Sequence, residues 1–427
     1  MDRRVLIVSL ILFAGGAAGV GVALFAFVGL DDATAETEVV WESSPAEGDD
    51  GSGAVVATVD GDPLVLQPAV ADGGSDGGGA DDADSERAAI RALDADGTVA
   101  WTVEVPGDVA PGGTSDLVVG DVDGDPAVVF TTEVGTLVAL DVADGTERFV
   151  TSVGAGSTIA PAAVDLRDDG VPTFVTVDDD GSVAAVDATG ETVFETELEG
   201  DAALRPLVVA GDPDGDDGET SANDEAAPST LAGAGVAVLT EETAGQRVTV
   251  LDASGNVVWS ERPDGTTVSW NAADSRRGGI LALGGADGTL RTLEASDGSL
   301  RYDVGLQDVP VDVGGADAGR IHVGGVGDVW AVDLLDGEVV WKQQYGGDVR
   351  VNEPSVGDVT GDGTAEIVAV NRDGDVLGMN RNGEAVVRGD TGPVVVYAPP
   401  LFADVTGDGV NEFLIVAEDG TVVALCS

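Results

Sequence analysis

Most of the chain alternates between short apolar runs of strand length and turns rich in glycine and aspartate. One element recurs: an apolar strand that reads Ala-Leu-Asp or a close variant, a glycine turn, and a second strand that usually ends in an aromatic residue. No helical periodicity interrupts this pattern after residue 30. Eight copies of the element begin in turn at residues 92, 139, 185, 250, 292, 331, 378 and 424.

The spacing of these copies predicts the fold. Successive copies lie 39 to 47 residues apart, except for one step of 65 residues, and further short apolar runs lie between them. Four short strands in each stretch of about 40–45 residues is the period of a propeller blade. The pattern therefore predicts an all-β protein, an eight-bladed β-propeller.

The eighth copy lacks its final strand, and the beginning of the domain supplies a candidate. Residues 38–41 read Glu-Val-Val-Trp, identical to residues 338–341 of the sixth copy. A ring that is closed by its own N-terminal strand leaves no sheet edge unpaired. We therefore expect residues 37–42 to complete the last blade, and the propeller to occupy residues 37–427 after a short linker at 31–36.

A different pattern precedes the propeller. Residues 5–30 carry no charge. This uncharged run is long enough for one transmembrane helix and longer than the core of a signal peptide. Two arginines precede this run and two aspartates follow it, so the positive-inside rule predicts a cytoplasmic start and an anchor within residues 1–30. The propeller would then lie outside the cell membrane as part of a single-pass protein. A twin-arginine-like start at 3–7 and a cleavage-like Ala-Thr-Ala at 33–35 leave export and release as the alternative.

The charge balance narrows the choice of environment and partners. The chain has 79 acidic and 19 basic residues, a net charge of −60, yet 43% of its residues are hydrophobic, so it is not a disordered acidic chain. Concentrated salt screens such self-repulsion. Lys342 is the single lysine, and we interpret this composition as adaptation to brine, of haloarchaeal type, with calcium buffering as the alternative. A polyphosphate would be repelled, so no nucleic-acid partner is expected.

Scarce cysteine and histidine limit the chemistry. Cys426 is the single cysteine and His322 the single histidine, so an intrachain disulfide, a CxxCH haem site and a Cys/His zinc cluster are excluded.

The repeated element resembles the tryptophan-docking motif of the PQQ-type eight-bladed propellers, a superfamily that includes quinoprotein dehydrogenases and non-enzymatic scaffolds. The resemblance covers almost everything after residue 37. It implies that an aromatic ring from each blade packs against the neighbouring blade. The seventh copy has Val387 in this place. The matching aromatic residues are Trp41, Trp101, Phe149, Phe194, Trp259, Tyr302 and Trp341.

Two acidic turns near the end of the chain are close copies of each other. Residues 358–366 and 404–412 both read Asp-Val-Thr-Gly-Asp-Gly-x-x-Glu and resemble the FG-GAP/VCBS turns that hold calcium in integrin-type propellers. Oxygen atoms at alternate loop positions suit calcium. The alternative is a turn shaped by side-chain-to-backbone hydrogen bonds. The candidate ligands are Asp358, Thr360, Asp362, Glu366, Asp404, Thr406, Asp408 and Glu412.

The equivalent turns of the fifth and sixth blades replace carboxylates with arginines. Arg276, Arg277 and Arg320 occupy these turns, which should be neighbours on one face of the ring. We interpret them as a candidate docking site for an acidic partner or a second copy of the chain, with scattered solvated arginines as the alternative. Two Gly/Asp/Ser-rich segments, 71–86 and 214–235, are expected to be flexible inserts.

Three hypotheses for function follow. A membrane-anchored, non-catalytic scaffold for other envelope proteins explains the anchor and the repeat, and a role as an enzyme is less favoured. A PQQ-dependent dehydrogenase is the alternative suggested by the resemblance, with Trp270 as the candidate to stack on the cofactor. A PQQ cofactor is not expected, because the adjacent cysteine pair often found in such enzymes is impossible here. Hydrolysis by two carboxylates is the third, and nothing in the sequence selects a pair.

Overall fold

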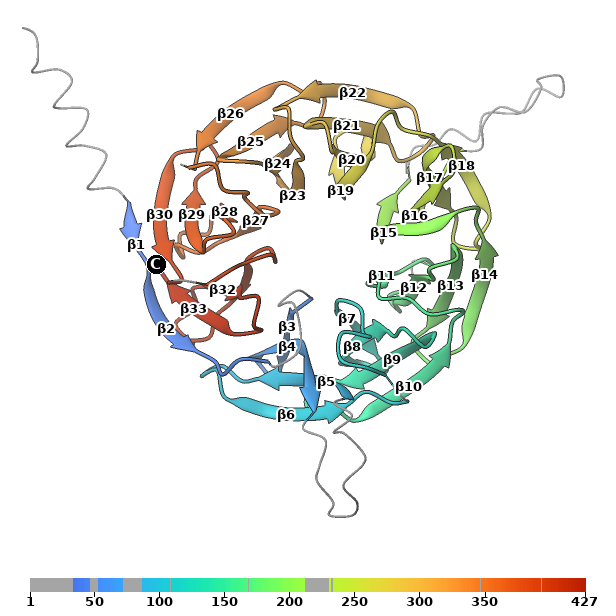
Figure 1. The fold of residues 1–427 in the computed structure, drawn as a ribbon, viewed down its shortest axis with the longest axis horizontal. Coiled ribbons are helices and arrows are strands. Elements are labelled where there is room, and N and C mark those ends of the chain that lie inside the picture. Colours follow the sequence, from blue (N-terminus) through green and yellow to red (C-terminus); the bar gives the residue numbers. More distant parts are fainter. Residues whose placement is uncertain are drawn as a thin grey trace, which may run out of the picture.

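The computed structural model describes residues 34–46, 53–71, 87–107, 109–167, 169–211, 230–231, 233–345, 347–392 and 394–427. These residues form a closed ring of eight sheets, and the prediction of an all-β, eight-bladed propeller is confirmed (Figure 1). The predicted helix at 5–30 lies outside the described residues. Within them, no helix is long and apolar enough to cross a membrane.

Each blade is built from four antiparallel strands, and the sheet of blade 7 has a fifth, parallel strand at its outer edge; blades are numbered here from blade 1 in chain order. The strands of blades 1 to 4, from the hub outward, are β3 (Val55–Val59), β4 (Asp62–Ala71), β5 (Arg87–Leu93), β6 (Val99–Glu104); β7 (Val118–Val122), β8 (Asp125–Thr131), β9 (Thr136–Asp141), β10 (Glu147–Ser152); β11 (Ala162–Val164), β12 (Thr173–Val177), β13 (Ser182–Asp187), β14 (Thr192–Glu197); β15 (Asp201–Ala210), β16 (Ala234–Glu242), β17 (Gly245–Leu251) and β18 (Val257–Glu261).

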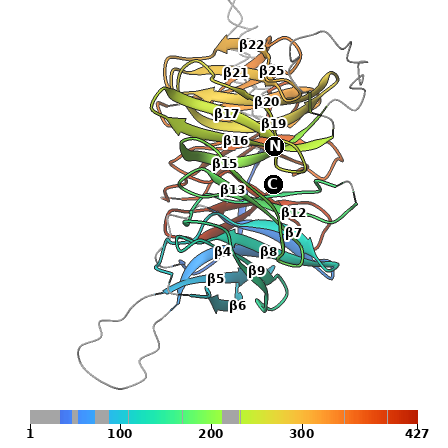
Figure 2. The same ribbon diagram turned by 90° about the vertical axis from the view of Figure 1, so that its right-hand side faces the viewer.

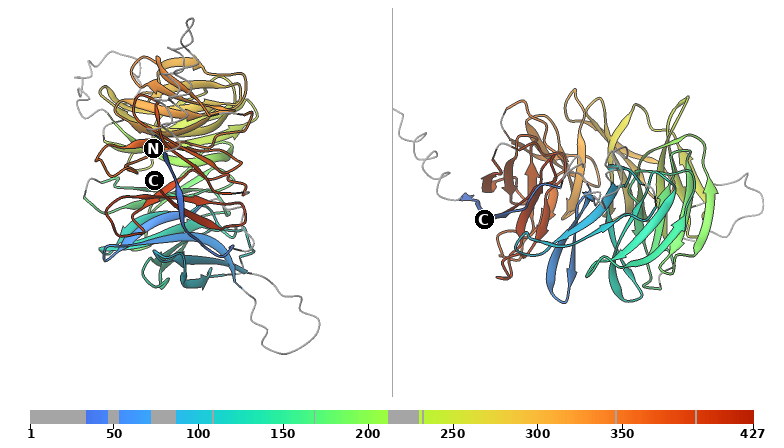
Figure 3. Two further views of the ribbon diagram at one scale, coloured as in Figure 1. Left: turned by 90° about the vertical axis from the view of Figure 1, so that its left-hand side faces the viewer. Right: turned by 60° about the horizontal axis from the view of Figure 1, so that its bottom comes forward.

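Blades 5 to 8 repeat the arrangement, and the side views show the blades stacked around the axis (Figures 2 and 3). Their strands are β19 (Thr267–Ser275), β20 (Gly278–Gly285), β21 (Thr289–Glu294), β22 (Leu300–Gly305); β23 (Asp312–Asp317), β24 (Arg320–Gly324), β25 (Asp328–Asp333), β26 (Val339–Gln344); β27 (Ser355–Gly357), β28 (Glu366–Val370), β29 (Asp375–Met379), β30 (Ala385–Asp390); β31 (Leu401–Ala403), β32 (Glu412–Val416), β33 (Val422–Cys426) and β2 (Glu38–Glu42).

The second and third strands of each blade form the core. All five residues of β12, β28 and β32 are buried, because each blade packs against a neighbour on both of its faces. Such strands read as continuous apolar runs rather than alternating ones. The outer strands alternate between partly buried and exposed residues, as in β6 and β26, because one of their faces meets solvent.

The N-terminal strand closes the ring as predicted. β2 pairs antiparallel with β33, with Trp41 opposite Ala424, the same register that places Trp341 opposite Ala331 in blade 6. A shorter strand, β1 (Ala35–Glu36), precedes it and pairs in parallel with β30 of blade 7. Residues 35 and 36, assigned to a linker from the sequence, therefore belong to the ring.

The predicted inserts fall mostly outside the described residues. Residue 71 ends β4, and residues 72–86 are not described. The second insert was predicted to reach residue 235, but β16 begins at Ala234, because the apolar run there continues the blade.

Candidate functional site

The joints between blades are built on the repeated aromatic residues. An ideal Cβ on Gly145 in the β9–β10 turn would lie 2.9 Å from Cε3 of Trp101, so the indole ring of blade 1 packs directly on the glycine of blade 2. The same contact recurs from Trp259 to Gly298 and from Trp341 to Gly383. The remaining pairs are Trp41 with Gly97, Phe149 with Gly190, Phe194 with Gly255, and Tyr302 with Gly337.

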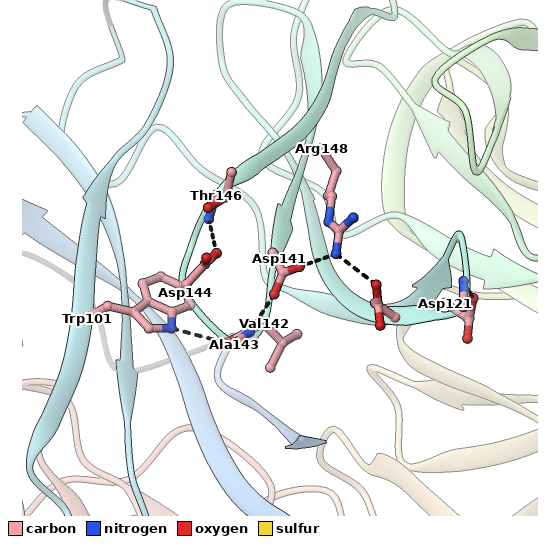
Figure 4. A network of polar contacts seen from close by, with 10 residues as sticks. Trp101, Asp121, Asp141, Val142, Ala143, Asp144, Thr146 and Arg148 are labelled. Atoms are coloured by element: carbon pink, nitrogen blue, oxygen red, sulfur yellow. Dashed lines mark hydrogen bonds and ion pairs between the residues drawn. The ribbon is translucent and has the colours of Figure 1, made fainter. Parts of the chain in front are cut away.

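Hydrogen bonds fix three of the indole rings across their joints. Trp101 Nε1 donates to the Val142 carbonyl at 3.0 Å (Figure 4), and Trp259 Nε1 donates to the Ala295 carbonyl at 2.8 Å. Trp341 Nε1 donates to the Arg381 carbonyl at 3.0 Å. Trp41 Nε1 and the Tyr302 hydroxyl are buried without a hydrogen-bond partner in the described part of the chain. The joints thus combine a large apolar contact with a directed polar one at these three positions.

The joint between blades 7 and 8 is different. Blade 7 has Val387 where the other blades have an aromatic residue, and Ala35 of β1 lies opposite Val387. Thr37 N donates to the Arg388 carbonyl at 2.9 Å, and the Thr37 side chain fills the space beside Gly389. The N-terminal segment therefore holds the two blades together by pairing with both.

The two acidic turns are organised by hydrogen bonds to backbone N–H groups. Asp358 accepts from Gly361 N at 2.8 Å and from Gly363 N at 2.9 Å. Glu366 is buried and accepts from Val359 N at 3.1 Å, and its burial raises the pKa of its carboxyl group. Asp362 accepts from Thr364 N at 2.7 Å.

The second turn has the same plan. Asp404 accepts from Gly407 N, Asp408 N and Gly409 N, and the buried Glu412 accepts from Val405 N at 2.8 Å and from the Thr406 hydroxyl at 3.2 Å. Within the described residues, no three His, Cys, Asp or Glu side chains are arranged to hold a metal ion. The described geometry is that of a hydrogen-bonded turn. Calcium binding stays a prediction from the sequence.

We expect Asp404→Ala to lower the free energy of unfolding by about 1 kcal/mol, as for the loss of a helix cap, because three backbone N–H groups lose their acceptor. Melts in molar NaCl measure the loss with and without a calcium chelator. If hydrogen bonding alone is responsible, the loss is the same in both buffers. A loss that disappears in chelator would show instead that the carboxylate acts through a bound ion, and elemental analysis would then find calcium on the wild-type chain.

The three arginines of blades 5 and 6 do not all point to one place. Arg276 lines a cavity of about 560 Å³ between these blades, together with Asp274 and Asp333. Arg277 is exposed beside it. Arg320 turns away from this cavity and donates to the Arg381 carbonyl of blade 7.

His322 is buried in blade 6 and stacks on Trp341, with 5.8 Å between ring centres. Its Nδ1 donates to the Gly315 carbonyl at 2.9 Å, since a carbonyl oxygen can only accept. Burial lowers the pKa of His322 to about 4. The imidazole is therefore neutral at pH 7 and has a structural place between strands.

This lowered pKa predicts a loss of stability in acid. The unfolded chain binds a proton on His322 below about pH 6.5 and the folded chain only below about pH 4, so stability falls by about 1.4 kcal/mol per pH unit across this window. The fall should be missing in His322→Gln. Denaturant unfolding of both proteins from pH 7 to pH 4 measures the difference, in which the effects of the shared carboxyl groups cancel. A difference that does not change with pH would contradict the buried neutral state.

A second cavity lies at the hub of the ring, at the end where the innermost strands begin. Its volume is about 480 Å³. Every blade contributes at least one residue to its wall, which makes it the point where all eight repeats meet. The contributions in blade order include Gly53, Asp116, Thr158, Arg205, Ser269, Asp312, Glu353 and Tyr397.

Three arginines line this hub cavity. Arg350 forms an ion pair with the buried Asp312, with 2.6 Å between Nε and Oδ2. Arg372 lies over the ring of Tyr397, with 4.9 Å from Cζ to the ring centre. Arg205 is exposed to the cavity, and its guanidinium forms no ion pair with the described residues.

Two carboxyl groups face the same space. Burial raises the pKa of Glu353, which accepts a hydrogen bond from the Ser269 hydroxyl at 3.1 Å. The pKa of Asp116 is raised as well, because the surrounding blades desolvate its carboxyl group even though water reaches it along the cavity. The charge of Arg205 opposes both shifts. The hub is thus a mixed polar site in which the positive charges are not outnumbered.

One family of known proteins matches most of the chain. The PQQ_2 family, described as outer membrane protein assembly factor BamB, matches residues 86–213, 169–309 and 244–425, which together run from 86 to 425. The chain belongs to this family. Membership confirms the resemblance to the PQQ-type eight-bladed propellers that the docking motif indicated. A comparison with curated protein sequences finds no match.

Solved structures agree with PQQ_2 membership at the level of the fold. BamB from Moraxella catarrhalis is 17% identical, with a TM-score of 0.55 over 92% of this chain and 98% of that chain. The computationally designed Ika8 protein is 15% identical, with a TM-score of 0.62 over 91% and 100%. Sqt1 from Saccharomyces cerevisiae is 11% identical, with a TM-score of 0.59 over 92% and 98%. At these identities the likeness shows the fold alone.

In this PQQ_2 propeller, Trp270 does not offer a face to the hub cavity for a cofactor to stack on. Only 3% of its surface is exposed, and its Nε1 donates to the Arg205 carbonyl at 2.9 Å. The indole is packed within the core between blades 4 and 5. Its place in the wall is therefore structural, and the stacking role considered from the sequence finds no support in its packing.

Sequence reasoning missed the hub cavity itself. Its residues come from eight different blades and from the least regular connections of the repeat, so no local motif marks them. The available signal was the position of Arg205, Arg350 and Arg372 near the starts of innermost strands or in inner turns of a chain with only 19 basic residues.

Proposed function

We propose that the protein is a non-catalytic scaffold that binds other proteins of the cell envelope, anchored in the cell membrane by residues 5–30 with its propeller outside. The observation that carries this proposal is the match of residues 86–425 to a family described as an outer membrane protein assembly factor. The closed ring supports it, because a rigid ring presents fixed surfaces at low entropic cost to binding.

The acidic surface is a further part of the proposal. A net charge of −60 suits concentrated salt, in which exposed carboxylates no longer repel one another strongly. Calcium at the turns of blades 7 and 8 is included on the strength of the sequence, and the chelator experiment above tests it.

The proposal is tested by chemical cross-linking of the full chain in its native membranes, followed by identification of the linked proteins. We expect reproducible links to membrane or envelope proteins, and weaker ones after Arg276, Arg277 and Arg320 are all changed to Gln. A control with the same change of charge carries Gln at Arg87, Arg167 and Arg388, which are exposed on other blades.

Two results would overturn parts of the proposal. If wild-type protein links to nothing in the membrane fraction, the scaffold function is wrong. If both triple variants lose the same partners to the same degree, the arginines of blades 5 and 6 have no special part, and only the loss of positive charge matters. A bound quinone absorbing in the near ultraviolet in native protein would favour the dehydrogenase instead.

A further inference from the structure

The lining of the hub cavity includes as many arginines as carboxylates, although the protein as a whole is strongly acidic. Three of the 19 cationic side chains of the chain line this one space, although acidic residues outnumber them fourfold overall. Packing does not require this, because the blades are already held by their aromatic joints and by apolar clusters between them. The arginines are therefore better explained by a role in the cavity than by a role in packing.

Two of the three arginines have unused hydrogen-bond donors. Arg350 is occupied by its ion pair with Asp312. Within the described residues, the guanidinium groups of Arg205 and Arg372 form no ion pair or hydrogen bond with a carboxylate, although the charge of Arg205 acts on Asp116 and Glu353 at longer range. The Cζ atom of Arg372 lies 4.9 Å from the centre of the Tyr397 ring, a cation–π contact that uses the charge of the guanidinium group and none of its N–H donors. The Tyr397 side chain is itself 43% exposed, so this pair is open to the cavity.

We propose that the hub cavity binds a ligand through a single carboxylate group, which is held by Arg205 and Arg372. Arginine matches a carboxylate with two parallel N–H donors, and such bonds are among the strongest that a side chain makes. Glu353 and Asp116 would repel a doubly charged phosphate more than a singly charged acid. A carboxyl group of raised pKa can also donate a hydrogen bond to a bound carboxylate when it is protonated.

The other lining residues determine the size and polarity of the ligand that the cavity can hold. Leu204, Ile159, Ala398 and Pro399 are apolar parts of the lining, and the volume of about 480 Å³ suits a small acid or the last residues of a peptide. The amide of Asn352 is already used in holding the carbonyls of Val396 and Ala398 at 3.0 and 3.2 Å. Both of its N–H groups are therefore occupied and cannot donate to a bound carboxylate.

This site is independent of the scaffold function proposed above. The hub cavity lies at the starts of the innermost strands, whereas Arg276 and Arg277 follow the end of β19 at the opposite end of the blades. Partner binding at the turns of blades 5 and 6 and carboxylate binding at the hub can therefore succeed or fail separately.

Ligand-observed NMR and calorimetry on the full chain, at one fixed NaCl concentration, test the site. The probes are succinate monomethyl ester, N-acetyl-trialanine with a free carboxylate, the same peptide as its C-terminal amide, and inorganic phosphate. We expect at least one singly charged acid to bind, and the amide and phosphate to bind at least tenfold more weakly. Arg205→Gln and Arg372→Gln should each weaken acid binding about tenfold or more, as for loss of a hydrogen bond to a charged group.

Arg276→Gln is the matched control, because it removes one exposed arginine away from the hub, and it should leave acid binding unchanged. Tighter binding of the peptide acid than of the small acid identifies the C-terminus of a protein as the natural ligand. Tighter binding of the small acid identifies a free metabolite acid. The proposal is wrong if no acid binds, if the amide or phosphate binds as well as the acid, or if all three variants bind alike. The acid and amide comparison needs only wild-type protein, so it decides the matter even if a variant does not fold.

Discussion

Replacing Trp259 with alanine is expected to lower the free energy of unfolding by about 3–5 kcal/mol, the range for removal of a large buried aromatic side chain. Trp259 is 6% exposed, packs on Gly298 of blade 5, and donates a hydrogen bond to the Ala295 carbonyl at 2.8 Å. The variant therefore loses an apolar contact, gains a cavity between blades, and leaves a buried carbonyl with one partner fewer. Denaturant unfolding in molar NaCl measures the loss.

A double-mutant cycle shows whether this loss arises at the joint. Gly298→Ala alone should be strongly destabilising, because its Cβ would lie 2.6 Å from Trp259 Cε3 and its φ is +74°. In the Trp259→Ala background the clash with the indole ring disappears, and the backbone strain remains together with a tight contact of 3.0 Å to Glu261 Cγ at the end of a flexible side chain. Gly319→Ala is the matched control, since its φ is +78° but nothing lies within 4 Å of the new atom. Additive effects of the two substitutions would contradict the direct contact.

Removal of residues 1–42 is expected to abolish the closed monomer. The deletion removes β1 and β2, leaves the edge of β33 unpaired, and takes Trp41 away from Gly97 of blade 1. Exposed sheet edges pair with other chains, so we expect dimers and larger species by light scattering, together with a melt that is lower and broader.

Removal of residues 1–36 is the companion variant. It deletes β1 and keeps β2, so the ring should remain monomeric, with a small loss of stability at the joint between blades 7 and 8. A chain that lacks residues 1–42 yet stays monomeric with an unchanged melt would show that β2 is not what closes the ring.

The fold could be predicted from the sequence because each blade repeats the same local information. The glycine turn and the aromatic residue of each copy lie on one strand pair, and the closing strand copies residues 338–341. The exception at Val387 also marked a real difference. The structure shows what differs there, since β1 pairs with β30 and Ala35 lies opposite Val387.

The site could not be predicted in the same way. The hub cavity depends on residues far apart in the chain, such as Arg205 and Tyr397, which are brought together only when the ring closes. Conversely, the acidic turns are conspicuous in sequence, but the same Asp and Gly residues serve a hydrogen-bonded turn as well as an ion site. The orientation of the Arg320 side chain could not be predicted either. Its guanidinium group donates to the Arg381 carbonyl in a turn of blade 7, so its orientation depends on a neighbouring blade and not on the sequence of its own.

The order of the two N-terminal strands has a mechanical consequence. A pull on residue 34 is borne first by β1, which is only two residues long and pairs with blade 7, and then by the five residues of β2 in blade 8. Tension would therefore detach the first strand while the ring is still closed by the second. The two strands therefore resist tension one after the other, the shorter strand first. A load too small to unfold the propeller would still free the outer edge of blade 7.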